Sequence, residues 1–439
     1  MNTEARDDGW RLEKPANRQL LAACLGGVLL LVLLGPLMVY SDQPMLGEGN
    51  AGRQLAYFAL TAAVLFGLRP AEWRRLIAVP IPLVVALGWC WLSLSWSIDP
   101  SVALRRMILT TLVIWIIFVS VRQIGSALTV NILRIALCVT LFANFVTVAL
   151  FPDFGIHQAN AIGDKELVGS WRGIMMHKNF AGEVSALLIP LLIFDAPRKW
   201  LWPRVAGIVA AAVFLYFSHS KTSLGLIGVA VLAGFAFERL PARRRVYVIP
   251  LLMVVFAAAA LLNDLYSNPL EALLRDPEAV TGRSSVWRAL LAYLNDHLWL
   301  GSGYGSFWNV GPISPIFKYA KGWITELANG HNGFLDLAVQ IGVPGALLVV
   351  ASVIVVPLVQ VFSDHRLKAQ RVAIVIAFIM FAFMHNTTES SLFDRDVIMQ
   401  VMLMFALALI PALKAEADRA DRRRVSSPWA TASMRHALS

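Results

Sequence analysis

Residues 20–40 read LLAACLGGVLLLVLLGPLMVY, an apolar run without a charged side chain. A run of about 20 apolar residues is long enough to cross a lipid bilayer as a helix. It follows basic residues at positions 6, 11, 14 and 18, but it is too long for the core of a signal peptide and has no clear small-residue cleavage site. We therefore expect it to be retained as the first membrane-spanning helix.

Similar apolar blocks recur along the chain. Further spans are predicted to begin near Leu55, Leu76, Met107, Arg134, Phe180, Leu201, Thr222, Val246, Phe334, Val372 and Val397. The predicted fold class is an all-α polytopic membrane protein with about 12 transmembrane helices and one large loop. Composition agrees, since 58% of the residues are hydrophobic and 15% are charged, against about 45–50% and about 25% in soluble proteins. A soluble enzyme and a disordered protein are excluded.

The basic residues predict the orientation of these spans. Most of the 38 Lys and Arg residues fall on alternate connections, which the positive-inside rule assigns to the cytoplasm. We expect residues 1–18 to be a cytoplasmic N-terminus, 19–413 the transmembrane domain and 414–439 a basic cytoplasmic tail. Within the domain, residues 264–330 form a large periplasmic loop. The net charge of +10 therefore indicates topology rather than nucleic-acid binding.

Ionisable residues beside spans are candidates for function. Although Lys and Arg alone set the orientation, six of the 8 histidines also fall on the outward side: His157, His177, His219, His297, His331 and His385. Five polar segments stand out on that side. They are 170–179 (SWRGIMMHKN), 218–223 (SHSKTS), 281–288 (TGRSSVWR), 331–345 (HNGFLDLAVQIGVPG) and 385–389 (HNTTE).

The cations of these segments would lie on one face of the membrane, and they are Arg172, Lys178, Lys221, Arg283 and Arg288. Such a cluster near the headgroup plane suits a lipid-linked phosphate or diphosphate. Taken singly, each cation could merely contact lipid phosphate, and each histidine could be an interfacial polar group. Asn179 and Asn386 could simply cap helix ends.

The large loop has helical spacing over Ser284–Leu298. Its Gly301–Gly305 run lacks the strand–turn–helix context of a nucleotide-binding loop. Its many aromatic side chains could stack on sugar rings or form an interfacial belt. The three cysteines, Cys24, Cys90 and Cys138, lie in apolar runs, so neither a disulfide framework nor a cysteine zinc site is predicted.

One segment carries a resemblance. His331 and Asn332 are followed by nine residues and then Gly-x-x-Gly, which resembles the signature of the O-antigen ligase and Wzy-type polysaccharide polymerase superfamily. The His-Lys-Asn before the sixth span, the Ser-Lys-Thr-Ser hairpin, the Gly-Arg-x-x-x-Trp start of the loop and its Gly-x-Gly-Tyr-Gly-x-Phe-Trp run agree, over roughly residues 90–400. Lys221 stands where lipopolysaccharide ligases usually have Arg, which favours the exopolysaccharide polymerase branch.

The resemblance implies a glycosyltransferase of the bacterial inner membrane with a periplasmic active site. Its donor would be an undecaprenyl-diphosphate-linked oligosaccharide, and its acceptor a glycan or lipid A-core. A chain-length regulator protein would be a further partner; nucleic acid, cofactor and metal would not be needed. His331 is the expected catalytic base, unless it only orients the loop on the span. Arg172, Lys178, Lys221, Arg283 and Arg288 would bind the diphosphate, with His177, Asn332, His219, His385 and Glu389 in support.

Two other functions remain open at this point. A transporter for a lipid-linked sugar would also use basic clusters, but transporters tend to place ionisable groups near the bilayer midplane within repeats, and no repeat is evident. A protein O-oligosaccharyltransferase would share the donor and use a Ser or Thr acceptor. A metal site is not expected at His331, because Asp336 would sit on a different helix face and Glu326 completes no ligand set.

Overall fold

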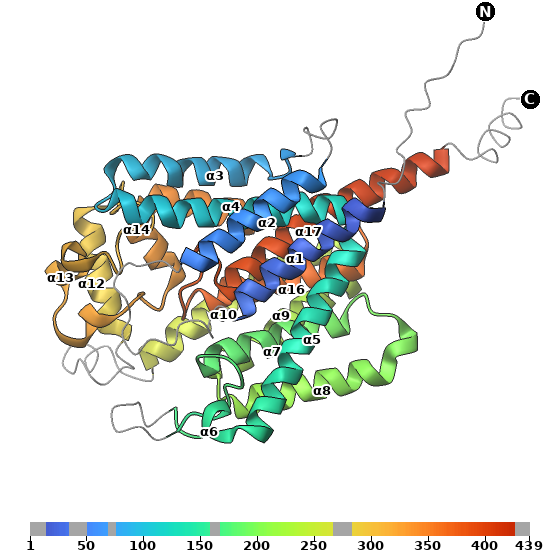
Figure 1. Ribbon diagram of the computed structural model, residues 1–439, viewed down its shortest axis with the longest axis horizontal. Coiled ribbons are helices and arrows are strands. Elements are labelled where there is room, and N and C mark those ends of the chain that lie inside the picture. The colour runs from blue at the N-terminus through green and yellow to red at the C-terminus, as the bar shows by residue number, and fades with distance from the viewer. Residues whose placement is uncertain (1–14, 35–50, 69–75, 159–166, 267–282, 426–439) are drawn as a thin grey trace, which may run out of the picture.

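The computed structural model describes residues 15–34, 51–68, 76–158, 167–266 and 283–425. These residues form a bundle of helices without a strand, and Ile156 and Trp171 make one isolated bridge among them (Figure 1). The all-α class is thereby confirmed. The start of α1 and the end of α17 lie at one end of the bundle, at the right in Figure 1, while α12 and α13 lie at the left.

Each predicted span coincides with a helix. These helices are α1 (Pro15–Leu34), α2 (Ala51–Gly67), α3 (Ile81–Leu92), α4 (Pro100–Ile124), α5 (Ser126–Leu150), α7 (Lys178–Ile193), α8 (Leu201–Phe217), α9 (Lys221–Arg239), α10 (Ala242–Tyr266), α14 (Gly333–Val350), α16 (Ala369–His385) and α17 (Ile398–Val425). Shorter helices are α6 (Pro152–Gly155), α12 (Arg283–Asp296), α13 (Ile316–Tyr319) and α15 (Val356–Ser363). The helix expected in the large loop is α12.

Five helices of the described part are long and apolar enough to cross a membrane, namely Pro100–Ile124, Ser126–Leu150, Lys221–Arg239, Gly333–Ser363 and Ile398–Arg423. Shorter apolar helices cover Arg18–Leu34, Ile81–Trp96, Leu201–Phe217 and Ala369–His385. The membrane-integral character is thus supported. The total of about 12 spans, the domain boundaries and the side of the membrane on which the large loop lies stay predictions.

The fifth span begins earlier than its apolar run indicated. Gly125 adopts a positive φ of 84° and ends α4, after which α5 starts at once at Ser126. Arg134, where the span was expected to begin, lies inside α5. Its guanidinium donates to Leu191 O at 2.9 Å, so a long basic side chain reaches a polar partner from within an apolar helix.

The core of the bundle is built on α16 and α17. Every side chain from Val372 to Ala382 is buried, and α16 lies against both α9 and α17. A helix that is apolar on all sides is expected in the interior of a bundle. The two ends of α16 are therefore held in fixed places, and its last residue, His385, reaches the candidate site.

The Gly-x-x-Gly of the sequence signature has a packing role. Gly342 breaks α14 with a positive φ of 73°, and a Cβ there would lie 2.0 Å from Trp299 O. A Cβ on Gly345 would lie 2.2 Å from Nε1 of Trp89. The two glycines thus let α14 approach the large loop and α3 closely.

Candidate functional site

Glu389 is the meeting point of three predicted segments. Its Oε1 accepts a hydrogen bond from Arg283 Nη2 at 3.0 Å and from Asn179 Nδ2 at 3.2 Å. Its Oε2 lies 3.3 Å from His331 Nδ1. The loop after α16 therefore joins the first turns of α7 and α12 and the residues before α14. Sequence reasoning assigned Glu389 only a supporting role.

The charge of Glu389 follows from these contacts. Burial would raise the pKa of this carboxyl, but the hydrogen bond to His331 and the positive charge of Arg283 outweigh burial, so the pKa lies below its usual range. Glu389 is therefore ionised near neutral pH, and an ionised carboxylate can only accept hydrogen bonds. In its neutral form, His331 therefore donates from Nδ1 to this carboxylate, which leaves the lone pair of Nε2 for a substrate.

His331 is held from both sides. Its backbone is left-handed, with φ of 50°, and its N–H donates to Asn329 Oδ1 at 3.1 Å. The side chain is 33% exposed and contacts the more buried Glu389. Since a non-glycine residue adopts this backbone only at a cost, the surrounding contacts fix the position of the imidazole.

A tight joint connects the starts of α14 and of the loop after α16. Asn332 caps α14 by accepting from Phe334 N and Leu335 N, both at 3.1 Å. The Gly333 N–H points at the carbonyl oxygens of Asn386 and Glu389, at 2.9 and 3.0 Å. A Cβ on Gly333 would lie 2.0 Å from Asn386 Oδ1. Segments 331–333 and 386–389 therefore keep one relative position.

A buried ion pair lies next to this joint in the sequence, at the last residue of α16. His385 Nε2 lies 2.8 Å from Glu183 Oε1, and both side chains are almost fully buried. The pair links α16 to the second turn of α7. Sequence reasoning named His385 but missed Glu183, although a carboxylate within an apolar span is itself a sign of function or pairing.

Three of the predicted cations are the first residues of helices, Lys178 in α7, Lys221 in α9 and Arg283 in α12. The start of α9 packs on α7, since a Cβ on Gly182 would lie 2.5 Å from Ser220 Cβ. Lys221 is exposed and makes no hydrogen bond or ion pair with the described residues. Backbone N–H groups and cations together make this end of the bundle attractive to anions.

A second group surrounds His157, which sequence reasoning did not select. The His157 and His177 rings lie 5.5 Å apart, and Lys178 N donates to His157 Nε2 at 3.3 Å. Burial, together with the positive charges of His177, Arg172 and Lys178, lowers the pKa of His157 to about 4. Burial is the largest cause of this shift, and the three neighbouring positive charges add to it.

Other predicted residues are engaged in local structure. The Arg172 guanidinium donates to Phe154 O at 2.7 Å and Met176 O at 3.3 Å, which ties its loop to α6. His177 caps α7. His219 Nδ1 lies 3.3 Å from Ser170 Oγ, and the exposed Arg288 donates to Ser285 Oγ at 3.1 Å. Their roles toward a substrate stay predictions.

The structure shows which aromatic side chains of the large loop are buried, and it bears on the cysteines and on groups that could bind metal. Tyr304, Phe307 and Trp308 are buried and pack the loop, whereas Trp299 and Trp323 are 70% and 51% exposed. Within the described ranges, the three cysteines are free and no group of three His, Cys, Asp or Glu side chains is placed to hold a metal ion. Metal independence stays a prediction for experiment.

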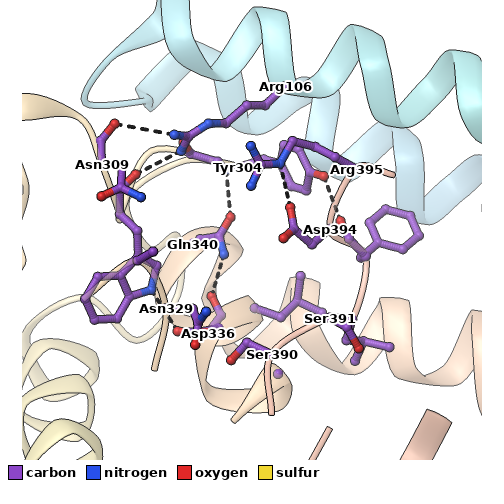
Figure 2. Close-up of a pocket in the computed structure, with 17 residues that line it drawn as sticks. Arg106, Tyr304, Asn309, Asn329, Asp336, Gln340, Ser390, Ser391, Asp394 and Arg395 are labelled. Atoms are coloured by element: carbon purple, nitrogen blue, oxygen red, sulfur yellow. Dashed lines mark hydrogen bonds and ion pairs between the residues drawn. The ribbon is translucent and has the colours of Figure 1, made fainter. Parts of the chain in front are cut away.

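A pocket lies behind the joint, with about 590 Å³ of space when its open mouth is included. Figure 2 shows Arg106 of α4 and Arg395 on one side and Asp336 of α14 and Ser390 on the other. Asn329, Gly333 and Ser390 line this pocket. Each of them lies within two residues of His331 or Glu389 in the sequence. Sequence reasoning missed the pocket because its walls come from four distant segments.

A comparison with known protein families finds a match within the chain. Residues 206–350 match the O-antigen ligase family (Wzy_C). The matched region runs from within α8 to the end of α14 and includes Lys221, Arg283 and His331, while Glu389 lies beyond it. Members of the family are glycosyltransferase-type enzymes, either ligases or polymerases. No curated protein matches the chain.

The O-antigen ligase match supports the resemblance to the O-antigen ligase and Wzy-type polymerase superfamily, and with it a membrane glycosyltransferase-like function in polysaccharide synthesis. The expectation of an enzyme is confirmed at that level. The exopolysaccharide polymerase branch, inferred from Lys221, stays a prediction.

Proposed function

We propose that this O-antigen ligase-type protein transfers or polymerises a glycan from an undecaprenyl-diphosphate-linked donor. The reaction is inverting and metal-independent, takes place on the periplasmic face of the inner membrane, and belongs to surface polysaccharide synthesis. The observation that supports it is the contact of Glu389 with both His331 and Arg283, at 3.3 and 3.0 Å. A candidate base and a candidate phosphate ligand thereby share one carboxylate.

The base step uses the free nitrogen of His331. As the acceptor hydroxyl oxygen attacks the anomeric carbon of the donor, its proton moves to Nε2 and the bond from that carbon to the diphosphate oxygen breaks. The proton ends on His331 and the electron pair ends on the diphosphate. Glu389 stabilises the imidazolium through Nδ1. A base in this position typically contributes about 10²–10⁴-fold to the rate.

The diphosphate step uses the cations at the helix starts. Arg283 is held by Glu389 through one Nη atom, so its remaining N–H donors can face phosphate oxygens. Lys178 and Lys221 add point charges beside the backbone N–H groups of α7 and α9. Charge that develops on the leaving diphosphate is stabilised there. No nucleotide is needed, since the diphosphate is already a good leaving group.

The acceptor separates the candidate activities. A polymerase adds the glycan to another glycan, a ligase to lipid A-core, and a protein O-oligosaccharyltransferase to Ser or Thr. Lys221, which gives a point charge where a ligase usually has a forked guanidinium, favours the polymerase. A deletion strain checks this choice: loss of polymer supports the polymerase, and unmodified lipid A-core supports the ligase.

Reconstitution tests the enzyme itself. Purified protein in liposomes that contain lipid-linked oligosaccharide should form new glycosidic bonds, also in the presence of excess chelator. Translocation of the lipid without bond formation would replace the proposal with the transporter. Activity that is lost with chelator and restored by divalent metal would contradict the metal-independent mechanism.

A further inference from the structure

The pocket behind the joint has two kinds of polar group. Some already satisfy one another: Gln340 accepts from Gly305 N at 2.7 Å and donates to Asp336 O at 2.9 Å, and Asp336 accepts from Trp308 Nε1 at 2.8 Å. Arg106 donates to Trp308 O at 2.9 Å. These groups, drawn with dashed bonds in Figure 2, hold the walls in shape.

Other groups of the same pocket keep unused donors and acceptors. Arg395 contacts Asp394 through Nε at 2.7 Å, and its Nη atoms make no hydrogen bond with the described part of the chain. The Asn309 side chain and the Asn329 Nδ2 likewise have no partner among described residues, and all of them line the pocket. Such a mixture of free amides, a guanidinium and a carboxylate can bind a ligand with many hydroxyl groups.

The charges of the pocket favour an uncharged ligand over the diphosphate. Its ionisable lining residues are two arginines, Arg106 and Arg395, and two aspartates, Asp336 and Asp394, so the formal charges cancel. The cluster at Glu389 instead has Arg283 at 3.0 Å from its single carboxylate, and Asn179, which follows Lys178, also contacts that carboxylate. The anionic leaving group therefore suits the Glu389 cluster, and an uncharged polar ligand suits the pocket.

The pocket also lies next to the candidate base. Asn329 lines the pocket with its side chain, and its Oδ1 accepts the N–H of His331 at 3.1 Å. Ser390 lines it too, accepts from Asn332 N at 3.0 Å and directly follows Glu389. The segments around Asn329 and Ser390 therefore hold the candidate base and also form part of the pocket wall.

We propose that this pocket binds the terminal sugar of the acceptor glycan, through Asn309, Asn329, Asp394 and Arg395. The assignment rests on the proposed function, since it names the acceptor subsite of that reaction. If the acceptor sugar binds in this pocket, its binding can be measured separately from that of the donor.

Binding without turnover tests the assignment. The probes are two lipid-free sugars, the donor's glycan unit released by mild acid and the core oligosaccharide of lipid A-core. Saturation-transfer NMR with the full chain in nanodiscs should detect binding of one of them. Asn309→Gly, which suits the positive φ of 54° at this position, and Arg395→Lys should each weaken binding about 3- to 10-fold. Lys318→Gln, in the same loop but outside the pocket, should not change it.

The outcomes separate the two proposals. Wild-type protein that transfers glycan but binds neither probe, or binds it equally well in both pocket variants, overturns the acceptor pocket and leaves the proposed function standing. Protein that binds a probe with the expected variant pattern but forms no glycosidic bond with lipid-linked donor overturns the proposed function and keeps the pocket as a glycan site. A weakening as large in Lys318→Gln as in the pocket variants also overturns the assignment.

Discussion

The two ends of α7 use their cations in opposite ways. At its last residues, Arg134 donates to Leu191 O at 2.9 Å, and Arg204 donates to Leu192 O and Ile193 O, each at 2.8 Å. At its first residue stands Lys178, and Asn179 contacts Glu389 at 3.2 Å. The rest of the bundle repeats the pattern. Arg371 pairs with Asp195 and Glu416 at one end, and Lys221 and Arg283 begin helices at the other.

The helix macrodipole explains why this difference matters. A cation at the C-terminal end of a helix stabilises the fold, and the same cation at the N-terminal end costs free energy. The macrodipole therefore accounts for Arg134 and Arg204, which lie beside the last carbonyls of α7. Arg371 lies in the first turn of α16, and its ion pairs with Asp195 and Glu416 account for it instead. Neither explanation covers Lys221, the first residue of α9, and the proposed anionic donor would explain a cation at that position. The comparison predicts that substitutions at the two ends have opposite effects on stability and on donor use.

The largest expected effect is at the base. His331→Asn removes the imidazole, and Asn tolerates the left-handed backbone of this position (φ 50°) better than Ala does. Glycan transfer should fall about 10²–10⁴-fold, with membrane insertion and the melting temperature close to wild type. Transfer is measured on purified protein with lipid-linked donor. Full-length polymer in a strain that carries either His331→Asn or His331→Ala would refute the catalytic assignment.

The next largest effect is on stability at the opposite end. Arg371→Ala removes the cation that contacts Asp195 and Glu416 at 2.5 and 3.0 Å, and only Lys368 then remains paired with Asp195 among the described residues. Breaking a fully buried pair costs about 3–5 kcal/mol, and since Glu416 is 33% exposed we expect about 1–3 kcal/mol here. The melting temperature should fall while the KM for donor stays constant. A raised donor KM would mean that the two ends are coupled.

Lys221→Ala should combine a loss of donor use with a small gain of stability. Removing one charged contact to phosphate should raise the KM for donor about 10-fold. Removing a cation from the start of α9 should stabilise the fold by about 0.3–1 kcal/mol. Lys221→Arg serves as the matched control for the charge. Equal donor KM in Lys221→Ala and wild type, with Arg283→Ala also unchanged, would remove the diphosphate assignment.

The smallest effect is a dependence of stability on pH. The pKa of His157 is about 4 in the folded chain, and about 6.5 is usual for an unfolded chain. Between these values the unfolded state binds more protons, so the unfolding free energy contributed by His157 is full above about pH 6.5 and falls as the pH drops towards 4. His157→Asn should flatten the melting temperature in this window, as recorded by thermal scans. An unchanged slope would contradict the lowered pKa of His157.

Glu389 also loses its contribution to stability on acidification, but at a lower pH. Its pKa lies below the usual range of about 4.3, so its contribution to stability is complete above that range and is lost only when the pH falls through the lower, folded value. Acid sensitivity between pH 6.5 and 5 therefore belongs to His157 rather than to Glu389.

The sequence predicted the helices well because apolar run length is a local property. It also placed His331, Glu389 and Arg283 on one side, because the charge rule and the histidine distribution act along the chain. The start predicted for the fifth span was wrong, because Arg134 lies inside α5 and its side chain reaches the carbonyls at the end of α7. A charged residue does not mark a boundary when its side chain is long enough to find such a partner.

The contacts between segments could not be predicted. Glu183 pairs with His385 and Asn179 with Glu389 across distances in sequence that periodicity does not encode. Arg172 was expected to bind phosphate, but nothing in its sequence neighbourhood shows that carbonyls of Phe154 and Met176 occupy its guanidinium. The pocket of Arg106, Asp336 and Arg395 exists only through packing, so its residues look unremarkable along the chain.

Gly333 carries no chemical group, yet its close approach to Asn386 sets how tolerant the enzyme is to mutation. A side chain at this position would displace residues 331–333 from 386–390, and both substrates would lose their ligands in one step. In a saturation screen scored by polymer production, Gly333 should therefore be as intolerant as His331. Any alanine scan that equates intolerance with chemistry would then mistake a residue of the joint for a residue of the reaction.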